Sequence, residues 1–220
     1  MTAFNALSIR EALEMRSAEG YEMRGIGQSE ALITIALLAY IGSMIFWQEW
    51  QKNLPEVGGG RQSISTRLAM PRASRWIFAK FVVVTLLSAA VMSLALAGGV
   101  IVSQIVLRGY SIDVDAALIL RTLLYGVLMA LFSAGLTLLL RSGLVPTVWL
   151  VANSTVVSIG YLVAQKWPGA WYFPDTVGSA LIRIDAEPGM PSSLMAGVFM
   201  SVWVVLVWIS GIIRERVSDE

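Results

Sequence analysis

The sequence contains no cysteine and no histidine among its 220 residues. The first absence excludes disulfides and thiol nucleophiles, and the second removes the commonest acid–base group and metal ligand. Charged residues are also scarce, at 14 %, and the net charge is +1. A balance so close to zero argues against a nucleic-acid partner. We therefore expect no metal site on this chain and no nucleic acid bound to it.

Motifs that carry enzyme chemistry are missing as well. The chain has no Gly-x-Ser-x-Gly elbow and no His-Glu-x-x-His pair. The glycine-rich stretch 58–63, "GGGRQS", lacks the Gly-Lys-Ser/Thr ending with which a Walker A loop grips phosphate. We predict no catalytic residue and no cofactor on this chain.

Apolar residues are abundant, at 56 %, and the mean hydropathy is +0.70. A helix needs about 20 apolar residues to cross the hydrocarbon core, and its backbone must satisfy its own hydrogen bonds there. The sequence therefore predicts an all-α, multi-pass membrane protein with about five transmembrane helices. The five stretches that meet or approach this length are 31–47, 76–107, 116–140, 144–164 and 194–213. Only "RSG" separates the third from the fourth, which predicts a tight hairpin.

Lysine and arginine gather between the first two apolar stretches, opposed only by Glu49 and Glu56. The cationic residues are Lys52, Arg61, Arg67, Arg72, Arg75 and Lys80. Because positive loops stay on the cytoplasmic side, we place this segment in the cytoplasm. Five spans then put the polar N-terminal segment, residues 1–30, outside; the alternative is that it lies on the cytoplasmic interface. The remainder divides into a transmembrane domain, 31–216, and a tail, 217–220.

Polar residues inside the predicted spans are few, and no Asp, Glu or Lys lies deep in any of them, which argues against a proton-coupled transporter. The fourth span carries a polar stripe that either lines a substrate path or makes interhelical hydrogen bonds. Its members are Asn153, Ser154, Ser158 and Tyr161. The third span has small residues along one side that predict close helix packing, namely Gly126, Ala130, Ser133 and Thr137.

The cytoplasmic segment predicts a short surface helix joined to a transmembrane helix. "RQSISTRLAM" places Ile64 and Leu68 on one face, and Pro71 ends the helix. Ser74 is then available as the N-cap of the next span. Such an element either anchors the loop to anionic lipid or transmits a push from a soluble partner into the membrane.

The stretch "RLAMPRASRWIFAK" resembles the cytoplasmic loop of ABC type 2 exporter permeases, in which a coupling helix precedes Leu-x-x-Pro-x-Ser-Arg and a Lys that opens the next span. An acidic residue often stands upstream, as Glu49 does here. The resemblance implies an ATPase-coupling role for Ile64, Arg67, Leu68, Met70, Pro71, Arg72, Ser74, Arg75 and Lys80. The family norm is six spans, so one is missing before this loop.

A second stretch, "WYFPDTVGSALIRID", is similar to the family's outer re-entrant helical loop. The residues assigned to it are Trp171, Pro174, Asp175 and Leu181. Asp175 is expected to cap a helix that carries Val177, Leu181 and Ile182 on one side.

The resemblance implies an exporter permease in the cytoplasmic (inner) membrane of a prokaryote. It would form the translocation path with a second permease subunit, either a copy of itself or a paralogue. Two separate ATPase subunits would bind ATP and Mg, and the apolar path suggests an amphiphilic substrate such as a peptide, lipid or hydrophobic drug. The alternatives are a non-transporting assembly or immunity subunit of the membrane, and a haem-exporter permease of cytochrome c maturation.

Overall fold

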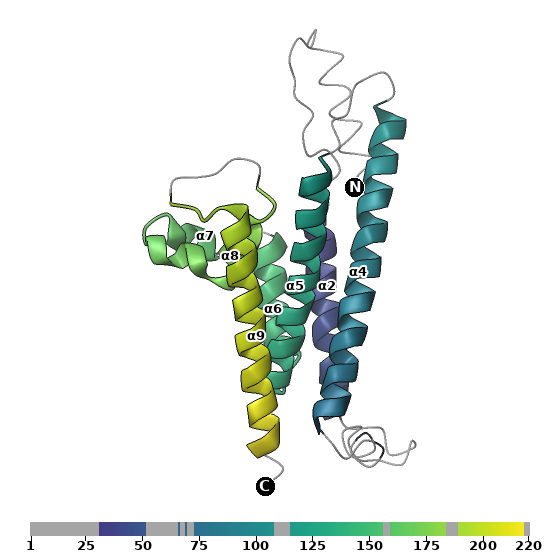
Figure 1. Ribbon diagram of the computed structural model, residues 1–220, viewed down its shortest axis with the longest axis vertical. Helices are drawn as coiled ribbons and strands as arrows, with labels where there is room; N and C mark the ends of the chain where they lie inside the picture. Colours follow the sequence, from purple (N-terminus) through teal and green to yellow (C-terminus); the bar gives the residue numbers. More distant parts are fainter. Residues whose placement is uncertain are drawn as a thin grey trace.

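The computed structural model describes residues 31–51, Thr66, Ala69, and residues 73–107, 115–155, 159–183 and 189–217. All regular structure within these segments is helical, with no strand, which confirms the all-α prediction. Four described helices are long and apolar enough to cross a membrane. They are α2 (Ala31–Trp47), α4 (Ala73–Val106), α5 (Ala116–Leu140) and α9 (Ser193–Val217), and they run along the long axis of the molecule (Figure 1).

The predicted fourth span, 144–164, is not described as one straight helix. It contains α6 (Leu144–Thr155) and α7 (Ile159–Ala164), with residues 156–158 outside the described segments. The 12 residues of α6 reach only about 18 Å, short of the roughly 30 Å hydrocarbon core. In Figure 1, α7 lies across the long axis instead of continuing α6. The prediction of a continuous span is therefore wrong at α7.

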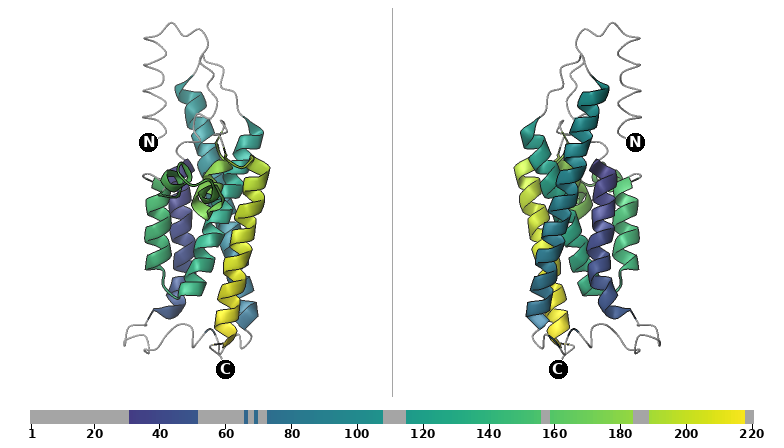
Figure 2. Two further views of the ribbon diagram at one scale, coloured as in Figure 1. Left: turned by 90° about the vertical axis from the view of Figure 1, so that its left-hand side faces the viewer. Right: turned by 90° about the vertical axis from the view of Figure 1, so that its right-hand side faces the viewer.

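The remaining short elements are η1 (Gln48–Trp50), η3 (Pro168–Tyr172) and α8 (Pro174–Ala180). Together with α7, the last two form a layer at one side of the bundle (Figure 1). We call α7, η3 and α8 the outer layer. The helix α6 packs against α2, as the two side views show (Figure 2).

Helix α5 is the centre of the bundle and packs against α2, α4 and α9. Its small and hydroxyl side chains make this possible, as predicted: Gly126, Ala130, Ser133 and Thr137 are all buried. Ser133 Oγ donates a hydrogen bond of 2.6 Å to the Ala39 carbonyl of α2. On the other side of α5, Trp208 Nε1 of α9 donates to the Leu131 carbonyl at 2.8 Å. Van der Waals packing and such interhelical bonds hold helices together in lipid.

The closest approach of α2 to α5 occurs at Gly42, where a Cβ would overlap the carbonyl oxygen of Ala130. Gly98 on α4 has no neighbour within 4 Å of the same position and is a matched control. We predict that Gly42→Val separates α2 from α5 and destabilises the protein by about 1–3 kcal/mol, the usual cost of overpacking. Gly98→Val should leave the melting temperature in detergent almost unchanged. Equal melting temperatures for the two variants would contradict this packing.

Candidate functional site

One end of the bundle is markedly basic. It contains the C-terminal ends of α2, α5 and α9 and the N-terminal end of α4 (Figure 1). Five of the eight Lys and Arg residues in the described segments lie there: Arg75, Lys80, Arg141, Arg214 and Arg216. We call this the basic end. The segment that joins α2 to α4, for which the sequence predicts a cytoplasmic position, begins and ends at this end of the bundle.

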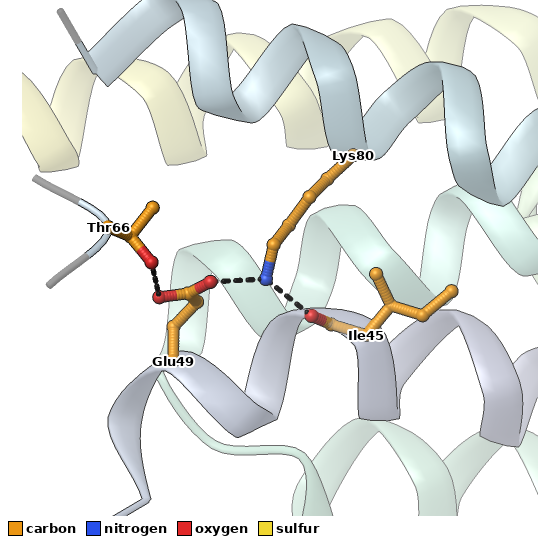
Figure 3. A network of polar contacts seen from close by, with 4 residues as sticks. All are labelled: Ile45, Glu49, Thr66 and Lys80. Carbon is orange, nitrogen blue, oxygen red and sulfur yellow. Dashed lines mark hydrogen bonds and ion pairs between the residues drawn. The ribbon is translucent and has the colours of Figure 1, made fainter. Parts of the chain in front are cut away.

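A buried ion pair fastens α2 to α4 at the basic end. Lys80 Nζ lies 2.6 Å from Glu49 Oε1, and Glu49 is only 2 % exposed (Figure 3). The same ammonium donates a hydrogen bond of 2.7 Å to the Ile45 carbonyl. That carbonyl belongs to the last turn of α2, where backbone acceptors have no partner in their own helix. Lys80 therefore neutralises Glu49 and also caps the end of α2.

The second carboxylate oxygen of Glu49 extends this network into the loop. Thr66 Oγ1 donates a hydrogen bond of 3.1 Å to Glu49 Oε2 (Figure 3). The loop is thus tied to a group that is itself bound to α4. We call Ile45, Glu49, Thr66 and Lys80 the loop anchor.

Aromatic rings enclose the ammonium of the loop anchor. Lys80 Nζ lies 5.4 Å from the ring centroid of Phe46 and 5.7 Å from that of Trp76. Phe46 also meets Trp208 of α9 edge to face, with ring centroids 5.4 Å apart. A cation held over ring faces gains cation–π attraction and loses water. The anchor is consequently coupled to α9 as well as to α2 and α4.

A second ion pair closes the basic end between α5 and α9. Arg141 Nη2 lies 2.8 Å from Glu215 Oε2, and the Glu215 side chain is 3 % exposed. Arg141 is the left-handed C-cap of α5, with φ 54°, and its N–H donates to the Thr137 carbonyl. Arg214 Nη1 donates to the Leu139 carbonyl. Both arginines therefore place positive charge at the C-terminal end of α5, where the helix dipole favours it.

The residues predicted to couple an ATPase are only partly described. Lys80 is in the loop anchor, while Ser74 and Arg75 are exposed at the start of α4. Because α4 begins at Ala73, Ser74 lies in its first turn, and the predicted N-cap role is wrong. The other members lie outside the described residues: Ile64, Arg67, Leu68, Met70, Pro71 and Arg72. Thr66 had no signal that singled it out in the sequence.

The polar stripe predicted for the fourth span is also only partly described. Asn153 and Ser154 belong to α6, without a described side-chain position, and Ser158 lies outside the described residues. Tyr161 belongs to α7. Its ring packs edge to face on Trp171 at 5.8 Å, and the Arg183 guanidinium lies 4.6 Å above it. These contacts assign Tyr161 to the outer layer.

The outer layer is organised by Asp175, though not as a helix cap. Helix α8 begins at Pro174 with Phe173 at the N-cap, so the predicted cap is wrong. Asp175 Oδ2 instead accepts a hydrogen bond of 3.1 Å from the Gly160 N–H and thereby joins α8 to α7. Of the predicted apolar side, Val177 lies in α8 and is buried, while Leu181 and Ile182 follow the end of the helix at Ala180; Leu181 is buried and Ile182 packs against the core. Trp171 is buried in the same layer.

Nothing in the described segments brings three acidic side chains close enough together to hold a metal ion. Comparisons with protein-family models, curated proteins and solved structures gave no match to this chain.

The loop anchor makes a direct prediction about stability. Lys80→Met leaves the carboxylate of Glu49 buried without its counter-ion, and removing one partner of a buried pair costs about 3–5 kcal/mol. Glu49→Gln leaves Lys80 without its counter-ion and should cost less, because the Lys80 side chain is 20 % exposed and still bonds to Ile45. We expect a clear fall in the detergent unfolding midpoint for Glu49→Gln and for Lys80→Met. The double variant should lose much less than the sum, because no uncompensated charge remains. Strictly additive losses in this double-mutant cycle would show that the pair is not coupled.

Proposed function

We propose that the chain is the permease subunit of an ATP-driven ABC exporter. It would form the translocation path with a second permease subunit and be driven by two separate ATPase subunits bound at the basic end. The observation that carries the proposal is the loop anchor, which ties the segment containing the family-like loop motif to two long apolar helices. A loop that serves only to hold lipid headgroups has no need of a buried ion pair at its base.

The proposed mechanism is mechanical coupling through the loop anchor. ATP binding would bring the ATPase subunits together and displace the loop segment 64–70. Because Thr66 bonds to Glu49 and Glu49 pairs with Lys80, the displacement would reach the ends of α2 and α4 together. Helix α4 has 34 residues and extends about 51 Å, so a tilt at its cytoplasmic end moves its outer end as well.

The path and the substrate class follow from the same proposal. Many apolar residues of α4 are exposed, including Phe78, Leu86 and Leu94, and this surface would face lipid or the second permease subunit. A path between two such surfaces suits an amphiphilic substrate. The polar members Asn153, Ser154 and Ser158 remain candidates for lining it.

The proposal predicts a stable complex with an ATPase. The tagged chain, expressed with its genomic neighbours and purified gently, should retain a Walker-type ATPase in stoichiometric amount, as measured by quantitative mass spectrometry. Arg67→Ala should reduce the retained ATPase about tenfold or more, since hydrogen bonds to charged groups contribute about 1.5–3 kcal/mol. Leu68→Ala should do the same, since burying a leucine side chain contributes about 1.5–3 kcal/mol. Lys166→Gln, an exposed cation of the outer layer, is the matched control.

Retention of the ATPase by Leu68→Ala and Arg67→Ala would overturn the coupling role of the loop. A clean wild-type preparation without any ATPase would overturn the exporter proposal, and the loop would then be a lipid anchor of a non-transporting membrane subunit.

A further inference from the structure

A cationic cavity of about 520 Å³ lies at the basic end between the C-terminus of α5 and the last turns of α9. Its lining residues are Arg141, Ser210, Ile213, Arg214 and Val217. None of them belongs to the loop anchor. The cavity is therefore a second feature of the basic end.

The donors around the cavity outnumber the acceptors available to them. Arg141 Nε is buried and has no hydrogen-bond partner within the described part of the chain, although Nη2 of the same guanidinium pairs with Glu215. Arg214 is exposed and donates one bond, to Leu139, while a guanidinium has five N–H donors. Two arginines, Arg141 and Arg214, thus line the cavity with no described carboxylate beside them in its lining, and the cavity favours an anion.

An apolar strip runs from this cavity along α9 into the membrane span. Leu206, Ile209, Ile213 and Val217 follow one another at intervals of three, four and four residues, which places them on one helix face. All four are exposed, by 49–67 %. A free anion would use only the arginines, whereas a molecule with an anionic head and an apolar tail would use both the arginines and the strip.

We propose that the cavity binds an anionic phospholipid of the cytoplasmic leaflet. The headgroup phosphate accepts hydrogen bonds from Arg141 and Arg214, and an acyl chain lies along the apolar strip of α9. Basic pockets between membrane helices on the cytoplasmic side suit anionic lipid headgroups. This inference rests on the orientation of the basic end and is independent of the exporter proposal.

The test uses the full chain in nanodiscs of zwitterionic phosphatidylcholine, with phosphatidylglycerol as the added probe. We expect phosphatidylglycerol to raise the melting temperature saturably at a few molecules per protein, and native mass spectrometry to detect it bound. Arg214→Gln should weaken this affinity about tenfold, because a charged hydrogen bond contributes about 1.5–3 kcal/mol. Lys166→Gln removes an exposed cation between α7 and η3, away from the apolar strip of α9; it is the control and should keep the wild-type response.

Arg141 is avoided as the main variant because its pairing with Glu215 supports folding. If Arg214→Gln proves too unstable to purify, Arg214→Lys keeps the charge but loses the planar fork, and an intermediate affinity is expected.

The inference is overturned if phosphatidylcholine and phosphatidylglycerol act alike, or if Arg214→Gln and Arg214→Lys both respond as wild type does. It is also overturned if inorganic phosphate at the same concentration gives the full shift. Asp219 and Glu220 lie outside the described residues. If phosphatidylglycerol raises the melting temperature only in the double variant Asp219→Asn/Glu220→Gln, then these two carboxylates occupy the cavity in the wild-type protein, and the inference is overturned.

Discussion

The ion pair between Glu49 and Lys80 is the interaction on which the basic end depends. A carboxylate that is 2 % exposed at the end of an apolar helix is costly unless a cation neutralises it and further donors satisfy its oxygens. Lys80 and Thr66 meet both needs, and Lys80 at the same time satisfies the last turn of α2. The need to neutralise a buried carboxylate therefore determines how the residues of the loop anchor are arranged.

The rest of the bundle follows from the way α5 accommodates its neighbours. Small residues let α2 approach the backbone of α5 closely. Hydroxyl and indole groups donate hydrogen bonds to backbone carbonyls of the neighbouring helix, as Ser133 does to the Ala39 carbonyl. Ion pairs and charged hydrogen bonds near the helix ends include Arg141 with Glu215 and Asp175 with the Gly160 N–H.

The apolar runs predicted most of the fold. The sequence limits of α2 and α5 agree with the structure, and α4 and α9 each begin slightly earlier than expected. Hydropathy does not report direction, so it did not reveal that α7 lies across the bundle. Contacts of α7 with later residues, such as the hydrogen bond from the Gly160 N–H to Asp175, are not visible in a local hydropathy pattern.

The candidate site was less accessible to sequence reasoning. The motif indicated Lys80, and Glu49 was noted as the acidic residue upstream. Their pairing across 30 intervening residues, with Thr66 from the loop, depends on the way α2 and α4 come together. Spacing alone does not predict it. The cavity at Arg141 and Arg214 was missed for the same reason, since α5 and α9 meet only in the folded bundle.

Binding of ATPases and of an anionic phospholipid both require the basic end to face the cytoplasm, where these partners would be found. Because the chain has no cysteine, single substitutions such as Ser74→Cys and Lys166→Cys introduce the only thiol, each at an exposed position. Labelling with a membrane-impermeant maleimide should modify Lys166→Cys in intact cells and Ser74→Cys only after permeabilisation. Modification of Ser74→Cys in intact cells, with Lys166→Cys protected, would contradict the account.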